Sequence, residues 1–402
     1  MIRRFQLCLV VLMLALAAFA AAGSAANVTA PLLIGVVGDI DASVHTSDGP
    51  SIEGVKLAAR DLNAVLERIG SERRIELVFE DTDAEPELAA TAVARLAEMG
   101  VRLIIGPYSS AEARAMMPVL DELGIVAISP SSTIPDLAVE DNLLRFAPND
   151  RLQARALASL YAVHGIAAVV PVVQDDPYGW GLLSALTEYV PAGVVLLQEV
   201  PFPVGDLTGS VDELEERVSA AVAEYGERSV AVQFIGFDEL VGAASRLSAS
   251  PVLSRVRWYG GDALASSAVL TASEEAAAFA IAVDLTATLP SPAIDTDNAR
   301  PVIDDLHRAG YSNVALTYPL TAYDALTVAA RAALIAGDAA GPEGLKEAIL
   351  SELKWFSGLT GRVVLDRYGD RIEYDYYYMG VSRLPGAGSG ATWVFLGRWS
   401  DK

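Results

Sequence analysis

The chain has 402 residues, a formal net charge of −23 and 52% hydrophobic residues. This length predicts two lobes, and the apolar content excludes a disordered chain. A protein this acidic is repelled by nucleic acid and by anionic lipid surfaces, so neither is expected as a partner. A single cysteine excludes an intrachain disulfide, and three scattered histidines argue against a metal site. No metal or cofactor is therefore expected.

Residues 1–26 have the pattern of a secretory signal peptide. Two arginines precede an uncharged apolar run, and residues 23–26 are small enough for a signal-peptidase site. An uncleaved membrane anchor is the alternative, but the apolar run is short for a membrane-spanning helix. We therefore expect cleavage near Ala25–Asn27 and an exported protein, in a periplasm or otherwise outside the cytoplasm.

The remaining chain alternates strand-like and helix-like segments. Continuous apolar runs such as 31–40 are typical of strands buried on both faces. The alternation predicts an α/β fold with two lobes, each a mostly parallel sheet flanked by helices. Loops are expected at 201–210, 290–301 and 383–392. Strands are expected at 31–40, 74–82, 101–108, 124–132, 167–176, 230–237, 256–262 and 372–381, and helices at 51–69, 86–99, 110–123 and 181–190.

Catalytic signatures are missing from the sequence. It contains no nucleophile elbow, no P-loop, no zinc-protease motif and no glycine fingerprint after a strand. The acidic pairs Asp175-Asp176 and Asp304-Asp305 are adjacent residues whose side chains diverge, so they are expected as surface or loop carboxylates. The sequence therefore argues against an enzyme.

Polar residues gather where predicted strands end and helices begin, which is where parallel α/β sheets bind ligands. The segments 106–113 (GPYSSAEA) and 129–137 (SPSSTIPDL) both have this position, and Ser109 with Glu112 fits a capping box. Two helix N-termini beside hydroxyl groups suit a small carboxylate, although plain helix caps explain the same spacing more simply. The segment 259–264 (YGGDAL) adds an acidic residue at a strand end, a candidate partner for the ammonium group of the same ligand.

The order and spacing of these segments resemble the leucine/isoleucine/valine-binding proteins, the type I periplasmic receptors of branched-chain amino-acid ABC transporters. The resemblance extends over nearly the whole mature chain, from LLIGVVGDIDASV to TAYDAL and the late strand. It implies two lobes joined by three crossovers, placed near 146–150, 282–286 and 377–380. The N-terminal lobe would comprise 27–148 plus 285–377, and the C-terminal lobe 149–284 plus 378–402.

The same resemblance assigns roles at the carboxylate end of a ligand. Ser110 matches the serine that binds the α-carboxylate, and Ser131 matches a residue that contributes backbone contacts. Thr133 matches a threonine that contacts both the carboxylate and the ammonium group. All three are expected in the first lobe.

At the ammonium end, Asp262 matches an acidic residue, often Glu, of the second lobe. Tyr178 and Phe237 match aromatic residues that this lobe presents to the cleft. An aromatic residue common in the family's first loop is missing, because Ser47 stands near that position. His45 is close by in the sequence and is expected as an exposed loop residue. The missing aromatic residue weakens the assignment of Leu, Ile or Val as the ligand.

The resemblance implies a monomeric solute-binding protein of an ABC importer, which closes around a small amino acid, preferably aliphatic or branched-chain, and docks on a membrane permease. Two alternatives remain at this stage. One is a sensor module with the same fold. The other is a receptor for amides, urea or aromatic acids, in which Asp262 accepts a hydrogen bond from an amide.

Overall fold

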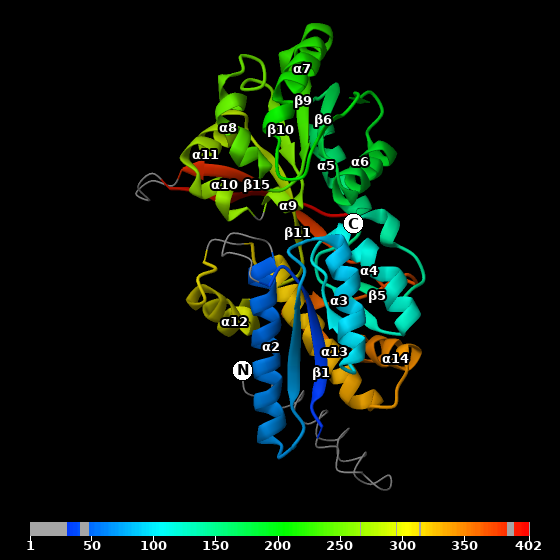
Figure 1. Ribbon diagram of the computed structural model, residues 1–402. Coiled ribbons are helices and arrows are strands. Elements are labelled where there is room, and N and C mark those ends of the chain that lie inside the picture. Colours follow the sequence, from blue (N-terminus) through cyan, green and yellow to red (C-terminus); the bar gives the residue numbers. More distant parts are fainter. Residues whose placement is uncertain are drawn as a thin grey trace.

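The computed structural model describes residues 30–40, 48–265, 267–294, 296–312, 315–383 and 390–401. The predicted signal peptide, His45 and Ser47 lie outside these residues. The chain forms two α/β lobes, with the first lobe below the second in Figure 1. Within the described part of the chain, no helix is both long and apolar enough to cross a bilayer.

The first lobe is built on a parallel sheet. Its strands are β1 (Leu32–Gly38), β2 (Ile75–Asp81), β3 (Leu103–Ile105), β4 (Val126–Ser129), β5 (Leu143–Pro148) and β14 (Asp370–Arg371). They are ordered β14-β5-β4-β3-β1-β2, and each neighbouring pair is parallel. Alternate residues of β1 enter different cores, with Ile34 and Val36 on one face and Val37 on the other. This burial on both faces explains the unbroken apolar run.

Helices cover both faces of the first sheet. One face carries α2 (Asp48–Arg68), α13 (Thr317–Ala336) and α14 (Pro342–Leu353), and the other carries α3 (Pro86–Glu98) and α4 (Ser110–Leu123). The remaining elements are the 3₁₀ turn η1 (Pro135–Leu137), the helix α12 (Thr296–Arg308) against α2, and the hairpin of β12 (Ser357–Gly358) and β13 (Gly361–Arg362).

The second lobe has a mixed sheet. Its strands are β6 (Ala168–Gln174), β7 (Val195–Leu196), β8 (Val200–Phe202), β9 (Val230–Ile235), β10 (Arg257–Gly260), β11 (Thr286–Ser291), β15 (Asp375–Arg383) and β16 (Ala391–Trp399). The order is β16-β15-β11-β10-β9-β6-β7, with β8 also paired to β6. The pairs from β7 to β11 are parallel, and β11-β15 and β15-β16 are antiparallel.

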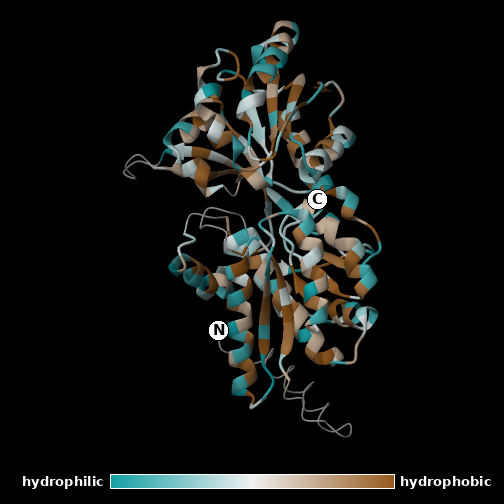
Figure 2. Cartoon of the chain, viewed as in Figure 1, coloured by the Kyte–Doolittle hydropathy of each residue, from teal (hydrophilic) through white to brown (hydrophobic). Residues whose placement is uncertain are grey.

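Helices flank this sheet as well. α5 (Asp150–Val163) and α6 (Pro177–Tyr189) cover one face, and α7 (Val211–Tyr225), α8 (Glu239–Ala249) and α11 (Glu274–Ala282) cover the other. Short turns complete the lobe: η2 (Thr208–Ser210), η3 (Glu227–Ser229), α9 (Asp262–Ala265) and α10 (Ala268–Ala272). Figure 2 shows hydrophobic residues concentrated on the strands and hydrophilic residues on the outer helices. The predicted α/β class with parallel sheets flanked by helices is confirmed.

Two predicted lobe boundaries need correction. The chain changes lobes between β5 and α5, between β11 and α12, and between β14 and β15. The boundary at 285 placed residues 286–291 in the first lobe, but β11 pairs with β10 and β15 in the second sheet, which satisfies its backbone on both edges. The boundary at 377 falls inside β15.

The segment 290–301, expected as a loop, contains the start of α12, whose buried residues Ala299, Val302 and Leu306 have helical spacing.

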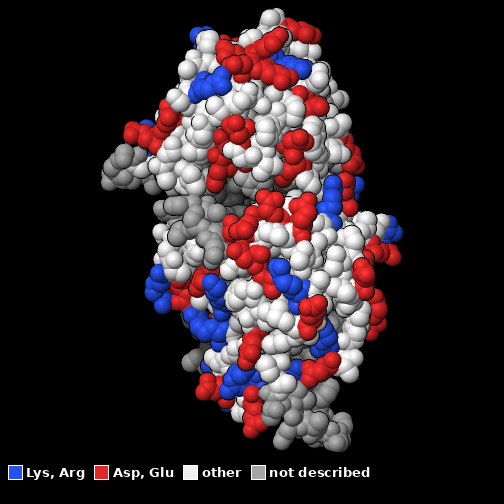
Figure 3. Space-filling model, viewed as in Figure 1, with Lys and Arg blue, Asp and Glu red and all other residues white. Residues whose placement is uncertain are grey.

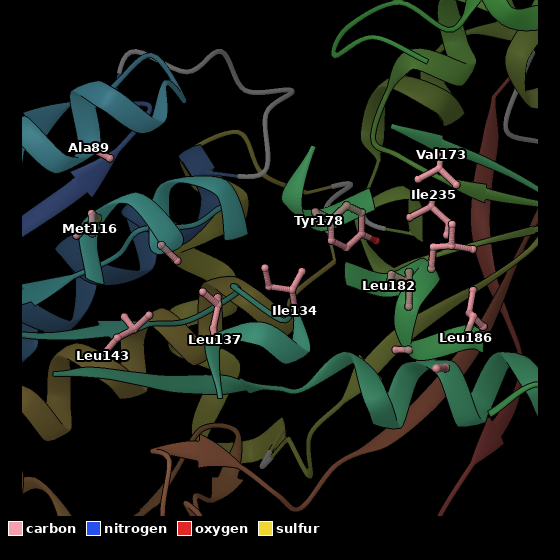
Figure 4. Close-up of a cluster of buried hydrophobic side chains, with 14 of the residues drawn as sticks. Ala89, Met116, Ile134, Leu137, Leu143, Val173, Tyr178, Leu182, Leu186 and Ile235 are labelled. Atoms are coloured by element: carbon pink, nitrogen blue, oxygen red, sulfur yellow. The ribbon is translucent and has the colours of Figure 1, made fainter. Parts of the chain in front are cut away.

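The lobes touch beside the first crossover. Ile134, next to η1, lies against α6, as Figure 4 shows with Tyr178 and Leu182 nearby. A Cβ atom on Gly181 would be 2.6 Å from Cγ2 of Ile134, so only glycine permits this approach. One apolar cluster therefore continues from the first lobe into the second.

Candidate functional site

Five strand ends supply the six residues predicted to bind a ligand. Ser110 follows β3, and Ser131 and Thr133 follow β4 in the first lobe. In the second lobe, Tyr178 follows β6, Phe237 follows β9 and Asp262 follows β10. Strand order reverses between β1 and β3 and between β6 and β9, so β3, β6 and β9 border these points and β4 and β10 are the next strands along.

The structure brings all six residues to one small pocket between the lobes. The pocket has a volume of about 40 Å³, and Tyr108, Ser109 and Tyr318 are among its other lining residues. Nothing in their local sequence requires this convergence, because it depends on how both sheets face each other. Their roles toward a ligand remain a prediction.

Two loops of the first lobe are hydrogen bonded to each other at this pocket. The hydroxyl of Ser109 accepts from the backbone N–H of Glu112 at 3.2 Å and donates to the Glu112 carboxylate at 2.7 Å, which confirms the predicted N-cap of α4. The Thr133 N–H donates to the Ser110 hydroxyl at 3.2 Å. The Ser131 hydroxyl donates to the carbonyl of Tyr108 at 2.7 Å. These bonds fix the hydroxyl groups at the start of α4 beside the turn after β4.

Asp262 forms the opposite wall of the pocket and is 3% exposed. Its carboxylate accepts hydrogen bonds from the Tyr178 hydroxyl and from Nε2 of Gln153, each at 3.0 Å, and from the Tyr318 hydroxyl. Tyr318 lies on α13 of the first lobe, so this last bond joins the two lobes directly. These three hydrogen bonds orient the carboxylate toward the pocket before a ligand binds.

A second buried carboxylate, Asp150, lies behind this wall. It accepts from the Thr133 hydroxyl at 2.9 Å and from Nε2 of Gln153 at 2.6 Å. Gln153 therefore donates to both carboxylates and holds them close together. Burial, followed by the charge of Asp262, raises the pKa of Asp150 to about 8. Near neutral pH the Asp150 carboxyl group is therefore mostly protonated.

Four residues of this site were missed by sequence reasoning: Tyr108, Asp150, Gln153 and Tyr318. Asp150 and Gln153 share one face of α5 at a spacing of three, directly after the N-cap Asn149, and this pattern was the available signal. Tyr108 adjoins Ser109, and its hydroxyl is buried with no partner among the described residues. Tyr318 carries no local signal, because α13 is distant in sequence from every other site residue.

A larger chamber of about 520 Å³ opens from the small pocket, within the range of small-molecule sites. Ser109, Phe237, Ala263 and Tyr318 line both spaces. The rings of Tyr178 and Phe237 lie with centroids 5.2 Å apart at the junction. Asp175 and Asp176, expected as surface or loop carboxylates, line the chamber, and Asp176 also caps α6 through a 2.7 Å bond from the Gly179 N–H.

Three aspartates of the first lobe lie close enough together to be considered as a metal site. Carboxylate oxygens of Asp39, Asp81 and Asp83 lie within 4.8 Å of one another. Asp81 and Asp83 are exposed, and an Asp81 oxygen already accepts from the Ile40 N–H at 2.9 Å. This arrangement is that of a solvated loop, and we assign no metal to it.

Two sheet-and-helix lobes with a pocket between their strand ends define the class of two-lobed ligand-binding proteins. The chain belongs to the periplasmic binding protein family, whose model matches residues 31–388. The predicted resemblance to the leucine/isoleucine/valine-binding proteins is thereby confirmed.

Three known proteins are similar to this chain over at least 90% of its length. An uncharacterized protein of Methanocaldococcus jannaschii, MJ1266, is 26% identical over 94% of this chain and 91% of its own length. The leucine-, isoleucine-, valine-, threonine-, and alanine-binding protein of Pseudomonas aeruginosa is 23% identical over 90% of this chain and 92% of its own. The crystal structure of the leucine-binding protein LivK of Thermotoga maritima superposes with a TM-score of 0.72 at 22% identity, over 92% of this chain and 99% of that one.

Proposed function

We propose that this protein is the extracytoplasmic solute-binding protein of an ABC importer and binds an α-amino acid between its lobes. The observation that carries the proposal is the pocket itself. The hydroxyl-bearing residues Ser110 and Thr133 line it from one lobe, and the acidic residue Asp262 lines it from the other. This polarity matches the carboxylate and the ammonium group of an α-amino acid. The named ligands of the Pseudomonas relative make aliphatic amino acids the first class to test.

The proposed mechanism is closure about the crossovers. An amino acid first binds the first lobe through its carboxylate. Its ammonium group then contacts Asp262 on the second lobe, and only the closed arrangement makes both contacts. Closure is therefore stabilised by the ligand's differential affinity for the closed state. The closed protein would dock on a membrane permease as a monomer and release its ligand there, with no chemical step.

The direct test is calorimetry and thermal unfolding of residues 27–402 with the common amino acids, urea, short amides and aromatic acids. Retained ligand is first removed by partial unfolding and refolding. A ligand at 100 times its dissociation constant should stabilise the fold by about 2.7 kcal/mol. Binding of any free α-amino acid supports the proposal. Binding only of amides, urea or aromatic acids would contradict the ammonium-binding role of Asp262.

Thr133→Ala is expected to weaken amino-acid binding by about 1.5–3 kcal/mol, the value of a hydrogen bond to a charged group. The hydroxyl of Thr133 already donates its hydrogen to Asp150, so its oxygen is positioned to accept from the ammonium group of the ligand. Calorimetric titration measures the loss. Thr133→Ser retains the hydroxyl and should bind nearly as the wild type, and a loss below a few tenths of a kcal/mol for alanine would remove Thr133 from the site.

Amino-acid binding should release a proton near neutral pH. The raised pKa of Asp150 keeps this carboxyl group protonated in the ligand-free protein. A bound ammonium group beside Asp262 favours the charged form of Asp150, so affinity should rise with pH and level off above about 8. Titrations in buffers of different ionisation enthalpy count the released proton. Asp150→Asn should abolish the release. An unchanged proton count in that variant would show that another group releases the proton.

The same pKa affects the stability of the ligand-free protein. Because the folded state holds this proton more tightly than the unfolded chain, Asp150 contributes stability that is fully present below the ordinary aspartate pKa of 3.8. That contribution is lost as pH rises through about 8. The Asp150→Asn variant should therefore show a smaller loss of stability over this pH range.

A further inference from the structure

The larger chamber of about 520 Å³ is lined by carboxylates from both lobes. Figure 3 shows acidic residues on both sides of the hollow between the lobes. Lysine and arginine are absent from the described residues that line it. Lysine and arginine are also absent from the sequence of the internal segments that the structure does not describe, which are 41–47, 266, 295, 313–314 and 384–389. The acidic lining residues are Asp39, Asp48, Glu85 and Glu112 of the first lobe and Asp175, Asp176, Asp238 and Glu239 of the second.

Several of these carboxylates have only neutral donors as partners. Glu112 accepts from the hydroxyls of Thr82 and Ser109, at 2.5 and 2.7 Å, and Glu239 accepts from the Phe237 N–H at 2.8 Å. Within the described chain, neither these two glutamates nor Asp176 lies within ion-pair distance of a basic side chain. Burial raises the pKa of all three carboxyl groups. A cationic group placed beside these three carboxyl groups would favour their charged forms and would be the first basic partner they have among the described residues.

An independent observation points to a ligand that donates hydrogen bonds. Gln174, at the end of β6, lines the chamber and is 2% exposed. Its buried side-chain oxygen has no hydrogen-bond partner among the described residues. A buried acceptor without a donor costs about 1–3 kcal/mol. A ligand with N–H groups at this end of the cleft would remove that cost, whereas an aliphatic side chain would not.

A bound amino acid would occupy both the small inner pocket and the larger chamber. The inner pocket has a volume of about 40 Å³ against about 520 Å³ for the chamber, so it has no room for a long side chain in addition to the α-carboxylate and ammonium groups. The side chain must extend into the chamber. Pro177, Phe237 and Ala263 there offer apolar surface to a methylene stem, and the carboxylates surround its end. Long basic side chains have this combination of apolar stem and charged tip.

We infer that the site selects α-amino acids whose side chain ends in an ammonium or guanidinium group. The inference rests on the proposed amino-acid function and names its ligand class. As the lobes close, an aliphatic side chain would strip water from the chamber carboxylates and return no interaction. A cationic side chain would pair with them in a cleft whose low-dielectric walls strengthen the field.

The test compares arginine with citrulline, a neutral isostere, and lysine with norleucine, by calorimetry on ligand-free protein. Arginine and lysine should bind at least tenfold more tightly than their neutral partners, and the difference should shrink with added salt. Leucine or norleucine binding as tightly as lysine would overturn the inference and leave the proposed function standing. Failure of every α-amino acid to bind would overturn both the inference and the proposed function.

A paired variant locates the effect in the chamber. Asp176→Asn with Glu239→Gln keeps the helix cap and the acceptor for the Phe237 N–H while removing two charges. Arginine affinity should fall at least tenfold and citrulline affinity less than threefold. The control, Glu216→Gln with Glu224→Gln, removes two charges from exposed positions of α7. An equal loss in the control would assign the preference to overall charge and contradict the inference.

Discussion

Asp262→Ala is expected to weaken amino-acid binding by roughly 30-fold to several thousand-fold. Truncating one partner of a buried charge pair costs about 2–5 kcal/mol, because the remaining charge loses its counterion out of water. Here the remaining charge would be the ligand's ammonium group. Asp262 faces the pocket with its carboxylate already oriented by Gln153, Tyr178 and Tyr318. Isothermal titration calorimetry measures the loss directly.

Two variants separate the charge of Asp262 from its hydrogen bonds. The two tyrosine hydroxyls donate to different oxygens of Asp262, so Asp262→Asn keeps the acceptor for one of them and removes the charge. It should bind almost as weakly as the alanine variant. Tyr318→Phe keeps the charge and removes one donor, and its loss should be smaller. Thermal unfolding shows whether each variant folds. Unchanged affinity in a folded Asp262→Asn protein would contradict the ammonium-binding role.

Arg145→Ala should destabilise the protein by about 3–5 kcal/mol, the cost of breaking a buried ion pair by removing one partner. Arg145 on β5 is 1% exposed, and its Nε donates to Asp370 at 2.6 Å, with a second parallel bond from Nη2. The substitution would leave the Asp370 carboxylate buried beside an empty space. Urea unfolding of the ligand-free protein measures the change in the free energy of unfolding.

A matched surface pair provides the control. Arg151 and Glu188 form an ion pair at 3.4 Å with side chains 49% and 54% exposed, so Arg151→Ala should cost at most about 1 kcal/mol. Equal effects of the two arginine substitutions would contradict the structural role of the buried pair.

The buried pair also supports the ligand pocket. Nη1 of Arg145 donates to the carbonyl of Ile134 at 2.7 Å, in the turn that carries Thr133. Asp370, on the short strand β14, holds that guanidinium in position. Arg145→Ala should therefore weaken amino-acid binding even at temperatures where the protein is fully folded. The pair connects residues 225 positions apart, and no local sequence pattern indicates it.

The sequence by itself determined the α/β class, the segments that form the strands and helices around the site, and the N-cap at Ser109. These features depend on the period of apolar residues and on hydrogen bonds between near neighbours, and both are legible along the chain. The family resemblance then selected six residues, and the structure places all six around one pocket.

Only the tertiary structure decided what surrounds those residues. β11 belongs to the second sheet because of its partners β10 and β15, although its own sequence fits either lobe. Tyr318 reaches Asp262 from the other lobe, and Gln153 joins two carboxylates that lie 112 positions apart. The acidic chamber likewise combines short loops of both lobes. Such contacts follow from how two separate sheets face each other, and that arrangement is set by packing across the whole molecule rather than by the spacing of residues along the chain.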